Sequence, residues 1–205
     1  VFVYFAPHLL FLDQYISETE KPSSLSIQYS YPLYPWQKDY HQSLVFKFKS
    51  RTGSGDVENN VQETLEQIKV LYNLSRGMPI IVYLSGWQEG GFDRQYPDLT
   101  KPGKHLIRPG IDSTPLAALK WLIQEAKNYN ASVSLHINMQ KATADNELYR
   151  VYVAEDLLCK GIFGQLLYKN VHSAGFQSNR ISTKLEWESG FAQKRIDDLM
   201  EMLPE

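Results

Sequence analysis

The sequence contains a single cysteine, Cys159, so no disulfide can form within the chain. It has no CxxC pair and no cluster of histidines of the kind that binds zinc, and we therefore expect neither a metal ion nor another cofactor. No GxGxxG or P-loop motif follows any of the predicted strands, which argues against the nucleotide-binding α/β folds.

The chain also lacks an excess of charge of either sign. It has 21 Lys and Arg against 23 Asp and Glu, for a net charge of −2, and no basic run. We therefore expect no nucleic-acid partner. The apolar opening stretch, residues 1–12, is interrupted by Pro7 and His8 and is shorter than the roughly 20 residues that span a bilayer. No basic segment of a signal peptide precedes it, and we expect no membrane insertion.

What the sequence has in plenty is aromatic residues, which make up 13% of it and include 13 tyrosines. Exposed aromatic rings stack on sugars, although aromatic side chains more commonly fill a protein core. With 43% hydrophobic and 21% charged residues, the composition is that of an ordinary globular protein.

Strand and helix signals alternate from Leu44 onward. Strands are predicted over 44–49, 79–84 and 132–138, separated by a helix capped by Asp56 and a helix with Pro115 in its first turn. A helix over 148–158, irregular chain and a final helix over 184–202 follow. This order predicts a parallel α/β sheet with right-handed crossovers, without separating an open sheet from a barrel.

The segment after the second strand, YLSGWQEGGFDRQYPD over 83–98, has the residues that a sugar site needs. Trp87 offers an aromatic face for the C–H side of a pyranose, while Gln88 and Asp93 offer partners for its hydroxyl groups. An equally good interpretation is that Trp87 is a core residue that closes the top of the sheet.

The third strand supplies a second candidate group. Apolar Val133, Leu135 and Ile137 alternate with polar residues, so His136 and Asn138 are expected on the face away from the helices, near the carboxyl end of the strand. A histidine in a strand is more commonly a satisfied core residue than a catalytic base. By the same alternation Lys47 or Lys49 of the first strand is expected to point into the same region.

The carboxylates give no catalytic pair. Asp112 is interpreted as a turn or capping residue, and Glu186 and Glu188 as first-turn residues stabilised by the helix dipole. A retaining glycosidase needs two carboxyl groups about 5–5.5 Å apart, and only Asp93 lies in a suitable segment.

Several motifs together resemble the endo-α-N-acetylgalactosaminidases, glycoside hydrolase family 101. They are Gly86-Trp87-Gln88, Gly91-Phe92-Asp93 and Tyr96-Pro97, the His136-Ile137-Asn138 strand, and the late segment WESGFAQKRIDDLMEMLP over 187–204. The similarity extends from about Ser43 to Glu205.

The resemblance implies a TIM-type (β/α)8 barrel, with residues 41–205 as about its first half and residues 1–40 as a β-rich leader or the edge of a preceding domain. It implies a secreted or cell-surface bacterial enzyme that releases Galβ1-3GalNAc, with retention, from Ser or Thr of mucin-type glycoproteins. Asp93 would hold sugar hydroxyls, and the remaining predicted site residues, Trp87, Gln88, His136 and Asn138, would line the same substrate site.

Two departures from the family qualify this expectation. Phe92 stands where the family usually has His, which removes a polar contact. The nucleophile Asp and the acid/base Glu are expected beyond Glu205. Two rival hypotheses therefore stand beside the enzyme: a non-catalytic carbohydrate-binding or surface protein that keeps the barrel rim, and an unrelated α/β protein in which Trp87 is buried.

Overall fold

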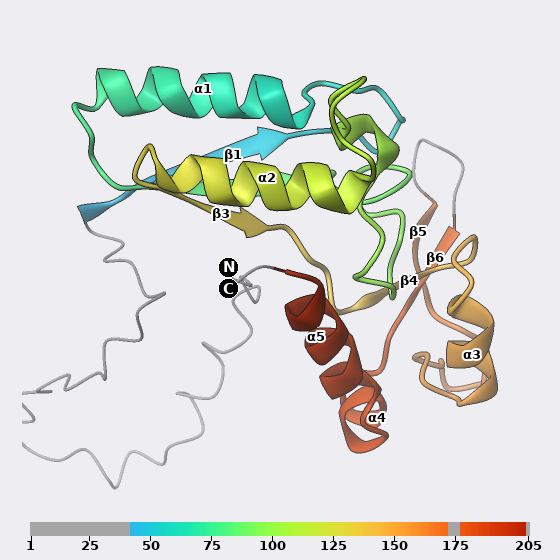
Figure 1. Cartoon of the computed structure of the whole chain (residues 1–205). Coiled ribbons are helices and arrows are strands. Elements are labelled where there is room, and N and C mark those ends of the chain that lie inside the picture. Colours follow the sequence, from blue (N-terminus) through green and yellow to red (C-terminus); the bar gives the residue numbers. More distant parts are fainter. Residues whose placement is uncertain (1–41, 172–176, 204–205) are drawn as a thin grey trace, which may run out of the picture.

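Three strands form a parallel sheet close to the predicted positions, although the third ends at Leu135 rather than at Asn138. The computed structural model describes residues 42–171 and 177–203, and its first sheet has the order β1 (Leu44–Lys49), β2 (Ile80–Ser85), β3 (Ala131–Leu135) (Figure 1). Lys47 lies opposite Tyr83, which in turn lies opposite Ser134, and both pairings are parallel. The sheet therefore brings the carboxyl ends of the three strands to one edge.

Two helices, α1 (Val61–Leu74) and α2 (Pro115–Lys127), lie side by side over one face of this sheet (Figure 1). Asn60, not Asp56, begins α1. The Asn60 side chain accepts from the backbone N–H of Glu63 at 3.0 Å, and the Glu63 carboxylate accepts from the backbone N–H of Asn60 at 2.8 Å. The prediction of an Asp56 cap is wrong, because the Asp56 carboxylate accepts from the hydroxyls of Thr52 and Ser54 in the preceding turn, while Asn60 and Glu63 satisfy two donors at the start of the helix.

The core lies between these helices and the sheet. Its buried residues come from both helices, from the strands, from the segment after β2 and from the last helix of the chain. Among them are Leu65, Ile68, Val82, Leu84, Trp87, Leu119, Leu122, Val133, Leu135 and Leu199. Val133 and Leu135 face this core as predicted, which directs the alternate side chains of β3 to the other face.

A second, antiparallel sheet follows, with the order β4 (Lys141–Thr143), β6 (Gln177–Arg180), β5 (Tyr168–Val171). A short helix, α3 (Tyr149–Ala154), lies in the same part of the chain (Figure 1). The expectations of a helix over 148–158 and of irregular chain after it are corrected here. These strands are short and polar, and their residues carry no alternating hydrophobic signal.

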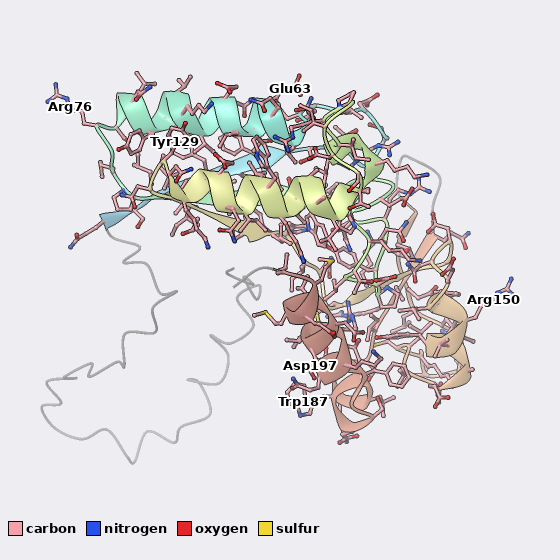
Figure 2. The ribbon with its side chains drawn as sticks, viewed as in Figure 1. Glu63, Arg76, Tyr129, Arg150, Trp187 and Asp197 are labelled. Carbon is pink, nitrogen blue, oxygen red and sulfur yellow. The ribbon has the colours of Figure 1, made fainter. Side chains whose placement is uncertain are left out.

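The last predicted helix is two helices, α4 (Thr183–Glu188) and α5 (Phe191–Met202). The break falls at Gly190, whose φ of 80° lies in the left-handed region that a helix interior excludes. The single helix would bury Trp187 on its apolar face, but Trp187 is 62% exposed and its side chain points away from the molecule (Figure 2). The break rotates α4 relative to α5, so the periodicity assumed for a single helix does not apply.

A buried ion pair connects the two last helices to the rest of the fold. Arg195 Nη1 lies 2.6 Å from Glu186 Oε1, and both side chains are almost fully buried. Arg195 also donates through Nε to the carbonyl of Pro97 at 2.7 Å, and the Tyr152 hydroxyl donates to Glu186 at 2.7 Å. The interpretation of Glu186 as a simple first-turn residue is therefore incomplete, because its carboxylate is enclosed and paired.

The predicted leader, residues 1–40, lies outside the described residues. Within the ranges that are described, no helix combines the length and the apolar character needed to cross a membrane.

Candidate functional site

A cluster of polar side chains surrounds Asp93 beyond the carboxyl ends of β2 and β3. Asp93 Oδ1 lies 3.0 Å from His136 Nε2. Its other oxygen, Oδ2, accepts from Asn138 Nδ2 at 3.4 Å and lies 3.4 Å from the ammonium of Lys141. The long segment after β2 thus folds back so that its carboxylate meets the residues that follow β3.

The ring of His136 is held from both sides. Its Nδ1 hydrogen-bonds to the hydroxyl of Tyr83 on β2, and its Nε2 faces Asp93. For a neutral ring, one arrangement satisfies both contacts: Nε2–H donates to the carboxylate and Nδ1 accepts from Tyr83. The tyrosine therefore fixes the tautomer and the orientation of the histidine.

Aromatic rings form one wall of this cluster. Phe92 stacks on His136 with ring centroids 4.8 Å apart and an interplanar angle of 15°. The ammonium of Lys47 on β1 lies 5.2 Å from the centre of the Phe92 ring and 5.6 Å from that of Tyr83. The expectation that a lysine of the first strand points into this region is met by Lys47. Lys49 instead lies 3.9 Å from Glu58.

The backbone that carries Asp93 depends on glycine at two positions. Gly86 has a φ of 70°, and a Cβ there would overlap the backbone of Arg51. Gly91 has a φ of 95°, and a Cβ there would overlap the carbonyl oxygen of Thr52. Asp93 itself has a φ of 64°, a left-handed conformation that a non-glycine residue adopts at a cost. Its hydrogen bonds hold it there.

The charge of Asp93 is stabilised by its partners. Burial alone raises the pKa of this carboxyl, but the hydrogen bond from His136 and the positive charge of Lys141 outweigh burial. The pKa of Asp93 consequently lies below its ordinary value, and the group is an anion at neutral pH. An ionised carboxylate is a strong acceptor for hydroxyl groups.

Trp87 and Gln88 have a different place from the one expected. Trp87 is only 1% exposed, and its Nε1–H donates to the carbonyl of His136 at 2.8 Å. Gln88 is 2% exposed and donates to the carbonyl of Asp98 at 2.8 Å. The idea that Trp87 presents its ring face to a sugar is therefore corrected. The indole packs beneath the cluster and supports the backbone of His136.

Sequence reasoning missed two members of the cluster. Tyr83 lies opposite Lys47 in the sheet, so the strand register could have placed it on the same face. Lys141 is 2% exposed and belongs to β4, a strand that no hydrophobic pattern in the sequence predicts. Asp112, by contrast, forms the expected local turn, with its carboxylate 2.7 Å from Arg108.

Comparison with models of known protein families assigns the chain to a family. Residues 35–205 match the family model described as endo-alpha-N-acetylgalactosaminidase. The chain belongs to this family. The resemblance seen in its motifs is thereby confirmed, over a slightly longer range than the motifs covered. No curated protein sequence matches the chain.

Solved structures agree on the fold of this family member. An alpha-N-acetylgalactosaminidase from Bifidobacterium bifidum, in complex with GalNAc, superposes with a TM-score of 0.60 at 12% identity, covering 78% of this chain and 25% of that one. A trehalose-6-phosphate hydrolase from Bacillus licheniformis has a TM-score of 0.50 at 11% identity, covering 78% of this chain and 32% of that one.

The chain thus spans about a quarter to a third of the length of these two structures. The neighbours are TIM-barrel glycosidases, and the described residues correspond to part of such a barrel, which they do not close. The same ranges contain no group of three or more His, Cys, Asp and Glu residues arranged to hold a metal ion.

Proposed function

We propose that the chain is about the first half of the (β/α)8 barrel of a retaining glycoside hydrolase that releases Galβ1-3GalNAc-type glycans from Ser or Thr of mucin-type glycoproteins. Its nucleophile and acid/base are expected beyond Glu205, an assignment that rests on the resemblance alone. In this proposal the enzyme is secreted or displayed on a bacterial surface.

The observation that carries the proposal is the Asp93 cluster. An ionised carboxylate, held by His136, Asn138 and Lys141, lies at the edge where barrel enzymes bind their substrates. In the substrate complex Asp93 accepts from a sugar hydroxyl, and the amide of Asn138 and the ring of Phe92 line the same pocket. Trp87 supports the backbone of His136 rather than touching the sugar, and Gln88 is buried against the carbonyl of Asp98.

Family membership and one fold neighbour both support N-acetylgalactosamine as the sugar. The family model carries the name of an endo-acting enzyme for this sugar, and the Bifidobacterium bifidum structure is an alpha-N-acetylgalactosaminidase with GalNAc bound. The sugar at Asp93 is therefore expected to be the GalNAc that is attached to Ser or Thr.

The alternative is a carbohydrate-binding or surface protein without turnover. It shares the Asp93 cluster and differs only in the catalytic carboxylates, so binding data alone do not separate the two functions. Incubating the complete natural protein with a core-1 glycopeptide does separate them. Release of Galβ1-3GalNAc with retained configuration supports the hydrolase, and measurable affinity without any release favours the binding protein.

A further inference from the structure

Lys141 combines deep burial with an ion pair to Asp93. Its side chain is 2% exposed, and its ammonium lies 3.4 Å from Oδ2 of Asp93. Burying an ammonium group is costly unless a carboxylate and hydrogen bonds compensate it. A lysine at a buried strand position is therefore kept for what its charge does, since an apolar side chain would fill the same space at lower cost.

The geometry points to Lys141 as a positioning residue of the proposed sugar site: it fixes the Asp93 carboxylate so that one oxygen stays open to a sugar hydroxyl. A carboxylate has about four lone-pair positions. Lys141 and Asn138 both lie at Oδ2, while His136 is, within the described part of the chain, the one hydrogen-bond partner of Oδ1. The remaining acceptor position on Oδ1 is thus the one available to a ligand.

The electrostatic surroundings of Asp93 make Lys141 the decisive cation. His136 hydrogen-bonds to the carboxylate, and the hydroxyls of Tyr83 and Tyr96 lie close to that histidine. The ammonium of Lys47 lies over the rings of Phe92 and Tyr83, whereas Lys141 is the permanent cation that pairs with the Asp93 carboxylate itself. Without the lysine, burial of the carboxylate is opposed only by its contacts with His136 and Asn138. The Asp93 carboxyl then protonates at a higher pH and accepts a hydroxyl less well.

The experiment removes the ammonium and keeps the shape, with the Lys141→Met variant of the complete natural protein. The inference rests on the proposed function, so the first measurement is kcat/KM of this variant on a core-1 glycopeptide as a function of pH. We expect a loss of about tenfold or more, as for a charge-assisted hydrogen bond, and an acidic limb that moves to higher pH. Lys194→Met is the matched control, because Lys194 also pairs with a carboxylate, Asp198 at 2.7 Å, but on the exposed face of α5.

A double-mutant cycle separates positioning from simple structural support. If Lys141 acts through Asp93, adding Lys141→Met to Asp93→Asn lowers kcat/KM no further than Asp93→Asn alone. An additive loss, or an unchanged acidic limb in Lys141→Met, overturns the inference.

A readout without substrate keeps this test independent of the proposed function. Lys141→Met should raise the pH at which acid begins to destabilise the folded protein, measured by thermal unfolding between pH 7 and pH 3. If the wild type releases no glycan but this shift appears, the function fails and the Lys141–Asp93 coupling stands. If the shift is missing, the coupling itself is refuted.

Discussion

The indole Nε1–H of Trp87 donates to the backbone carbonyl of His136 at 2.8 Å, so a buried aromatic ring connects the end of β2 to the end of β3. The hydroxyl of Tyr96 approaches the same carbonyl at 3.3 Å. The position of the histidine ring beside Asp93 is thus fixed from its backbone as well as from its side chain. The polar cluster at the two strand ends is thus held together by a side chain that is itself buried.

Trp87→Phe should therefore weaken both the fold and the site. It keeps an aromatic ring but removes the N–H donor, and we expect a loss of about 1–3 kcal/mol in the free energy of unfolding, with reduced glycan binding. Urea denaturation measures the first effect. Trp187→Phe is the control, since Trp187 is 62% exposed and its replacement should change stability by less than about 0.5 kcal/mol.

The buried pair of Arg195 and Glu186 predicts a large and non-additive effect. Arg195→Met leaves the Glu186 carboxylate buried without its cation, which should cost about 3–5 kcal/mol in urea denaturation. Adding Glu186→Leu should recover part of this loss, because no uncompensated charge remains. A double variant less stable than Arg195→Met would contradict this account. Lys194→Met, which breaks an exposed pair with Asp198, should change nothing measurable.

His105 predicts a pH dependence of stability in the mildly acidic range. Burial, followed by the positive charge of Arg51, lowers the pKa of His105 to about 4. The unfolded chain binds this proton near the ordinary value of about 6.5, so stability is greatest above that pH and falls as the pH drops towards 4. His105→Phe should flatten the fall in melting temperature between pH 7 and pH 4.5. An equal fall in the variant and the wild type would contradict the prediction.

Phe92 predicts a change in substrate preference. Phe92→His keeps a flat ring against His136 and restores the polar group that the family usually has. A new hydrogen bond to the substrate should raise kcat/KM for a Galβ1-3GalNAc peptide, relative to a GalNAc peptide, about tenfold, and an unchanged ratio would contradict the prediction. Phe92→Leu, which removes the ring and adds no polar group, should lower kcat/KM for both peptides and leave the ratio of the two values unchanged.

The parts of the fold that the sequence predicts are those in which one periodicity dominates. Leu44–Lys49 is a strand as predicted because its apolar residues alternate, and Pro115 begins α2 because its fixed φ suits a first turn. The same alternation correctly directs His136 and Asn138 away from the helices. Asp93 joins them because parallel strands end at one edge.

The parts that the sequence does not predict depend on contacts between distant segments. Lys141 reaches Asp93 across 48 positions of sequence, on a three-residue strand that has no pattern of its own. Trp87 lies in a segment typical of a sugar site, yet its indole finds a backbone acceptor 49 positions away and becomes buried. Composition gives the kinds of residue in the site, and tertiary packing decides which of them face the solvent.

The central claim, that Asp93 is the sugar-binding carboxylate, is tested most directly by Asp93→Asn. The measurement is the affinity of the complete natural protein for N-acetylgalactosamine by calorimetry at neutral pH. Asp145→Asn is the matched control, because Asp145 pairs with Arg94 at 2.7 Å on the surface nearby. The account predicts a loss of about tenfold or more for Asp93→Asn alone. Unchanged affinity in Asp93→Asn, or an equal loss in the control, would contradict it.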